Sequence, residues 1–91
     1  MRRAARSDDN QDAIVKALRR VGVQVEPIRK PVDLLICHKG ETALMEVKNP
    51  DGRDQLTKDQ VEFIRRWPGK IHVVRSVDEA LFAVLGKEVM K

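Results

Sequence analysis

Aromatic residues are scarce in this chain of 91 residues, which has two Phe, one Trp and no Tyr. Proteins that bind single-stranded nucleic acid through base stacking need aromatic platforms, so this composition argues against that class of binder. Cysteine is equally scarce, and Cys37 alone forms no internal disulfide, which suits a reducing cytoplasm. The chain also lacks an apolar run that could span a membrane, and no apolar stretch of a signal peptide follows its basic N-terminus. We therefore expect a soluble cytoplasmic protein that does not associate with membranes.

The length allows a single domain with a modest core. A chain of 91 residues buries a smaller share of its surface than a large protein, although 42% apolar residues suffice for a packed interior. We expect residues 1–7 to be a flexible basic arm and residues 8–91 to form the domain. The net charge of +4 permits a polyanionic partner. Arg2, Arg3 and Arg6 in the arm are candidate DNA contacts, with a solvated tail as an equal alternative.

The pattern of apolar residues and helix breakers predicts an α/β fold. A helical spacing of apolar residues begins at Asp8 and ends at Gly22, since glycine commonly follows a last helical turn. Strands are predicted at 23–28, 33–38 and 42–48, and the apolar run at 34–37 is typical of a strand buried on both faces. Two capping boxes, which begin at Thr57 and Ser76, predict helices to about residues 67 and 86, with a strand at 70–75 between them. The order αβββαβα indicates a mixed central sheet flanked by helices.

Two carboxylates and a lysine are predicted to meet at one edge of this sheet. Glu46 and Lys48 lie two residues apart in a strand and therefore share a face. A turn at Lys39-Gly40-Glu41 makes this strand antiparallel to the one before it, so Asp33 at the start of one strand lies beside the end of the next. We expect Asp33, Glu46 and Lys48 to form a cluster.

Such a cluster matches the needs of phosphodiester hydrolysis. Carboxylate oxygens bind Mg²⁺ or Mn²⁺, which polarises a phosphate and lowers the pKa of water, and the backbone carbonyl of Val47 is a further candidate ligand. A neighbouring lysine can orient water and stabilise charge that develops on the phosphate. The alternative is a solvated Glu-x-Lys salt bridge beside a turn aspartate. The order of elements favours the catalytic interpretation.

The chain resembles the virus-type replication–repair nuclease (VRR-NUC) family of the PD-(D/E)XK nuclease superfamily. The resemblance covers nearly the whole chain and is carried by Asp33-Leu34-Leu35-Ile36, Glu46-Val47-Lys48, Leu56-Thr57 and Gln60. It implies that Asp33 and Glu46 are metal ligands, that Lys48 is the catalytic lysine and that Gln60 faces the active site. It also implies a DNA endonuclease, dimeric, that acts on branched DNA such as four-way junctions in phages and bacteria. The rival hypothesis is a non-catalytic nucleic-acid-binding module on the same fold.

Two positions depart from the family's pattern. The superfamily motif places proline directly before the aspartate, whereas here Val32 intervenes. Related nucleases often carry a metal-binding glutamate in the first helix, about three turns before its final glycine, and Gln11 holds that place here. An amide is a poorer Mg²⁺ ligand than a carboxylate, which weakens the case for a second metal. Gln11 is a possible metal ligand, or the capping partner of Asp8. Gln60 likewise either faces the active site or serves as the capping partner of Thr57.

The remaining candidates have weaker signals. Arg53 and Lys58 follow the predicted catalytic strand, where they could meet a DNA backbone. His38 and His72 are too isolated to predict a zinc site, and we expect structural or surface roles for both. The last predicted helix has more apolar surface than a lone domain of this size readily hides, so it either packs on the sheet or contacts the partner of a homodimer; its apolar residues include Leu81, Phe82, Val84 and Leu85.

Overall fold

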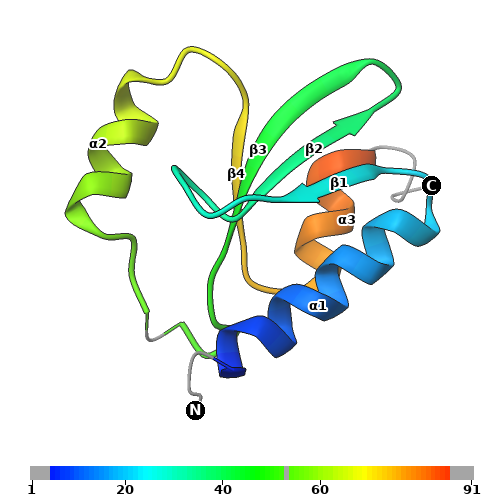
Figure 1. The fold of residues 1–91 in the computed structure, drawn as a ribbon, viewed down its shortest axis with the longest axis horizontal. Helices are drawn as coiled ribbons and strands as arrows, with labels where there is room; N and C mark the ends of the chain where they lie inside the picture. The colour runs from blue at the N-terminus through cyan, green and yellow to red at the C-terminus, as the bar shows by residue number, and fades with distance from the viewer. Residues whose placement is uncertain (1–4, 53, 87–91) are drawn as a thin grey trace.

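The protein is an α/β fold with a four-stranded mixed sheet and three helices (Figure 1). The computed structural model describes residues 5–52 and 54–86, with side chains from residue 10 onward. The elements are α1 (Ala5–Arg20), β1 (Gln24–Pro27), β2 (Leu34–His38), β3 (Glu41–Val47), α2 (Lys58–Arg66), β4 (Ile71–Val74) and α3 (Val77–Leu85). The predicted order αβββαβα is confirmed. None of the described helices has the length and apolar character needed to cross a membrane.

Helix α1 begins earlier than the sequence suggested. It starts at Ala5 instead of Asp8, so part of the segment expected to be a flexible arm is helical. Alanine and arginine favour helix formation, which explains how the helix extends past the polar run that resembled a cap. Arg6 therefore belongs to α1, whereas Arg2 and Arg3 lie outside the described residues. The other end agrees with the prediction, because Gly22 follows the helix with a φ of +92°, which glycine adopts without strain.

The sheet order is β1-β2-β3-β4. β2 pairs antiparallel with β1 on one side and with β3 on the other, whereas β4 runs parallel to β3. Between β2 and β3, Lys39 and Gly40 have φ values of +52° and +83°, the positive angles of a type I′ hairpin turn. This turn sets Leu34 opposite Met45, so the start of β2 lies beside the end of β3. A parallel strand needs a crossover connection, and α2 supplies it on the way to β4.

Helices α1 and α3 pack on one face of the sheet (Figure 1). The core there includes the fully buried Ile14 and Leu18 of α1, Met45 of β3 and Ala80 of α3. The opposite face has thinner cover, because α2 has no buried residue. For that reason Leu35 stays 37% exposed, and the prediction that β2 is buried on both faces is wrong.

The two predicted capping boxes have different outcomes. At α2 the box is complete, with Thr57 and Gln60 as its members. At α3, Ser76 Oγ accepts the Glu79 N–H at 3.1 Å, but the Glu79 carboxylate accepts the N–H of Arg75 at 2.7 Å instead of that of Ser76. The second box is therefore only half formed, because the Glu79 side chain bonds to Arg75, the residue before the N-cap Ser76.

Candidate active site

Asp33 and Glu46 meet where β2 begins and β3 ends. The Asp33 N–H donates to Glu46 Oε1 at 3.2 Å, and the Val47 N–H donates to Asp33 Oδ2 at 2.9 Å. These reciprocal bonds link the two strands one residue beyond the Leu34–Met45 pair of their register. The predicted proximity of the two carboxylates is confirmed.

Lys48 completes the cluster from the residue after β3. Its Nζ lies 3.3 Å from Glu46 Oε2, and the two side chains are only 10% and 6% exposed. The Lys48 N–H donates to the Val74 carbonyl at 2.9 Å, which extends the pairing with β4 and fixes the backbone at this point. The alternative of a solvated surface salt bridge is wrong, because both charged groups are buried. Burying two charges carries a desolvation cost that a surface pair avoids.

Gln60 is a member of the capping box of α2 and also contacts Glu46. Its Oε1 accepts the Thr57 N–H at 3.1 Å, and its own N–H donates to Thr57 Oγ1 at 3.1 Å, which is the capping box. The capping box does not use the Gln60 side-chain nitrogen, and this Nε2 donates to Glu46 Oε2 at 2.8 Å. The first turn of α2 is thereby joined to the carboxylate of Glu46.

The electrostatics of the cluster are unfavourable for a charged Asp33. Burial, together with the charge of Glu46 and a hydrogen bond between the two side chains, raises the pKa of Asp33 to about 6 from its ordinary 3.8. The Val47 N–H and the ammonium of Lys48 oppose this rise without cancelling it. Two carboxylates in this position would gain from a further positive charge between them.

The donor set fits a small hard cation. Asp33 and Glu46 supply carboxylate oxygens, and the Val47 carbonyl belongs to the peptide between Val47 and Lys48. In the described part of the chain, no group of three or more His, Cys, Asp or Glu could hold a metal. Mg²⁺ tolerates such a small protein donor set, because it retains several waters and is commonly held by one or two carboxylates. The residues present therefore suit Mg²⁺ or Mn²⁺ better than a cation that needs a full protein cage.

Asn10 of α1 also reaches the site, although it was not among the predicted site residues. Its Nδ2 donates to the Lys48 carbonyl at 2.8 Å. Asn10 precedes the buried Ile14 by four residues, a spacing that puts both on one helix face and could have indicated this contact. The polar run from Asp8 to Gln11 resembled a helix cap instead.

Gln11 is half-buried beside Asn10. The predicted capping role of Gln11 is wrong, because α1 begins at Ala5 and Asp8 is therefore not the N-cap residue of this helix. Among the hydrogen bonds between described side chains, none joins Gln11 to Asp33 or Glu46. Its role as an additional ligand stays a prediction.

The candidate DNA contacts are only partly within the described structure. Lys58 is the exposed first residue of α2, two positions before Gln60. Arg53 lies outside the described residues, as do Arg2, Arg3 and the side chain of Arg6. Lys58 is therefore the candidate whose place near the cluster can be stated.

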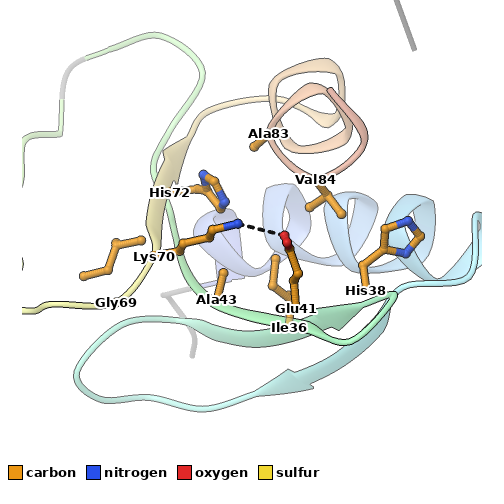
Figure 2. Close-up of a pocket in the computed structure, with 10 residues that line it drawn as sticks. Ile36, His38, Glu41, Ala43, Gly69, Lys70, His72, Ala83 and Val84 are labelled. Atoms are coloured by element: carbon orange, nitrogen blue, oxygen red, sulfur yellow. Dashed lines mark hydrogen bonds and ion pairs between the residues drawn. The ribbon is translucent and has the colours of Figure 1, made fainter. Parts of the chain in front are cut away.

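A cavity of about 460 Å³ lies elsewhere, between the sheet and α3 (Figure 2). Its walls include both histidines, and the Lys70–Glu41 ion pair of 2.7 Å crosses it. Both ring nitrogens of His38 are buried without a hydrogen-bond partner in the described structure, and burial followed by the charge of Lys70 lowers the pKa of His72. The cavity adjoins the start of β3 on the α3 side, whereas Glu46 lies near the end of β3 on the other face. It is separate from the carboxylate cluster.

Comparisons of the chain with protein-family models, with curated proteins and with solved structures found no match. The interpretation of the cluster therefore depends on its residues and their geometry.

Proposed function

We propose that this protein is a Mg²⁺- or Mn²⁺-dependent DNA endonuclease that hydrolyses phosphodiester bonds. The observation that carries the proposal is the convergence of the half-buried Asp33 with the buried Glu46 and Lys48 at one end of β3. A buried ion pair is weak evidence for stability, since apolar residues of similar volume often do as well or better. Catalysis gives a reason to retain these charges at that cost.

Each side chain has a distinct part in the proposed reaction. Asp33 and Glu46, with the Val47 carbonyl, would hold the metal ion, which supplies Lewis-acid polarisation of the scissile phosphate. Lys48 would orient the attacking water and stabilise the negative charge that develops on the phosphate. Gln60 would keep Glu46 in place through its 2.8 Å hydrogen bond.

The fold supports the resemblance to the VRR-NUC family and its PD-(D/E)XK core. Three antiparallel strands followed by a crossover helix and a parallel strand bring the residues of the motif together. By this resemblance the substrate would be branched DNA such as a four-way junction, and the protein would act as a homodimer. Phe82 of α3 is 52% exposed and could contribute to such a contact, whereas Leu81 and Val84 pack against the core.

Cleavage assays distinguish this function from a non-catalytic nucleic-acid-binding module. A labelled four-way junction, a linear duplex, a single strand and an RNA hairpin would each be incubated with protein in Mg²⁺, Mn²⁺ or EDTA. We expect cleavage in either metal and none in EDTA, with the junction cut fastest. Binding of the junction without cleavage under every metal condition would instead favour the non-catalytic module.

A further inference from the structure

Helix α2 has little packing to hold Gln60 against the site. No residue of α2 is buried, and Val61 and Trp67 remain 50% and 40% exposed. Stacking of Phe63 on Trp67, with ring centres 5.1 Å apart, occurs between the helix and its own cap residue. Burial of α2 side chains therefore contributes little to holding the segment that joins Lys48 to α2, and polar contacts must hold it instead.

That segment is held by Arg75, the residue after β4. Arg75 Nη1 donates to the Asn49 carbonyl at 2.7 Å and to Asp54 Oδ1 at 3.1 Å, while Nη2 donates to the Asp54 carbonyl at 2.9 Å. The Asp54 carboxylate in turn accepts the Asn49 N–H, at 2.9 Å through Oδ1 and 3.1 Å through Oδ2. The N–H and the carbonyl of Asn49 are thus both hydrogen-bonded, and these contacts join Asn49 to Asp54 across the loop.

Arg75 is itself fixed in place. Its backbone N–H donates to the Glu79 carboxylate at the start of α3, and the preceding Val74 accepts the Lys48 N–H. Contacts with the residue after β3 and with α3 therefore hold the backbone from which its guanidinium extends. The side chains of Arg75 and Asp54 are 28% and 33% exposed, so the pair is partly shielded from solvent. A planar guanidinium can make several directed bonds at once, which the compact ammonium of lysine cannot reproduce.

We infer that Arg75, with Asp54, is a positioning residue for the Asp33–Glu46–Lys48 site, an inference that rests on the proposed nuclease function. Asn49 directly follows Lys48, so the bonds to its N–H and carbonyl restrict the backbone from which the lysine extends. The same bonds hold the start of the loop that leads to α2 and Gln60. A displacement of a catalytic group by about 1 Å can lower a rate about 100-fold.

The test compares the Arg75–Asp54 pair with an exposed pair on α2. Steady-state cleavage is measured for Arg75→Ala, Asp54→Ala, their double variant and Arg75→Lys. Glu62→Ala and Arg65→Ala are the matched controls, because that ion pair is 57% and 71% exposed on its two sides. Thermal unfolding confirms that each variant is folded at the assay temperature. Hydrogen exchange of the Asn49 amide provides a readout that needs no activity.

We expect each single variant of the Arg75–Asp54 pair to lower kcat by about 10- to 100-fold with KM little changed. The double variant should be no slower than the singles, and Arg75→Lys should also have a low kcat although it retains the charge. The Asn49 amide should exchange faster in all four, and the two controls should match wild type.

Three results would overturn the inference. If wild type cleaves DNA and Arg75→Ala retains its kcat, the positioning role is wrong while the nuclease function stands. A raised KM in Arg75→Ala that Arg75→Lys restores, with Asp54→Ala unaffected, would identify Arg75 as a DNA contact instead. If wild type cleaves nothing in Mg²⁺ or Mn²⁺, the proposed function itself fails and the positioning role fails with it.

Discussion

Asp33→Asn should stabilise the metal-free protein at neutral pH while it abolishes cleavage. The pKa of Asp33 rises from 3.8 to about 6 in the fold, so the folded state binds this proton more tightly than the unfolded chain does. Stability therefore falls as pH rises from about 4 to about 6, and the full penalty is present above pH 6. The interval corresponds to about 3 kcal/mol, and because Asp33 is only half-buried, solvent screening reduces the expected effect to about 1–2 kcal/mol. Asparagine removes the charge and still offers an oxygen to the Val47 N–H.

Urea unfolding in EDTA measures this effect at several pH values. At pH 7.5 the variant should be about 1–2 kcal/mol more stable than wild type, and the difference should vanish near pH 4. Asp12→Asn, an exposed change on α1, should shift stability by at most about 0.5 kcal/mol. Added Mg²⁺ should stabilise wild type more than Asp33→Asn, since ligand binding to the folded state raises its stability. A variant less stable than wild type at pH 7.5, or a difference independent of pH, would refute this reasoning.

Four further predictions concern the site and the assembly. Lys48→Gln should slow single-turnover cleavage by about 100- to 1,000-fold, with the Kd for DNA little changed in filter binding. Gln60→Glu retains the capping partner of Thr57 but sets another carboxylate against Glu46, so urea unfolding should show lower stability without metal and a larger gain from Mg²⁺. Gln11→Glu should lower the Mg²⁺ concentration that gives half-maximal cleavage, and identical titration curves would refute a ligand position there. Light scattering should give a dimer mass at micromolar concentration, and a fully active monomer would refute the homodimer.

The order of elements could be predicted because local signals carry it. Gly22 ends α1 through its positive φ, and Thr57 and Gln60 cap α2 as their spacing indicated. The proximity of Asp33 and Glu46 could also be predicted from the sequence, because a tight turn at Lys39-Gly40 sets the register of the two strands. Strand alternation then puts Glu46 and Lys48 on one face.

The contacts that surround the site could not be predicted in the same way. Asn10 reaches the Lys48 carbonyl from α1, and Arg75 reaches Asn49 and Asp54 from the end of β4. Both depend on how α1 packs and on the parallel pairing of β4 with β3, which no local pattern in the chain specifies. The exposure of Leu35 has the same origin, since it depends on how sparsely α2 covers that face.

Single-turnover cleavage of a labelled four-way junction by wild type and Glu46→Gln, with the Kd for the junction measured in parallel, tests the metal-dependent site most directly. In Mg²⁺ we predict that Glu46→Gln cleaves at least about 100-fold more slowly than wild type. The Kd should be little changed, because basic residues make most phosphate contacts. Glu62→Gln, an exposed change on α2, should match wild type in both measurements. Cleavage by wild type in EDTA, or cleavage by Glu46→Gln at the wild-type rate, would contradict a metal-dependent site built on Asp33, Glu46 and Lys48.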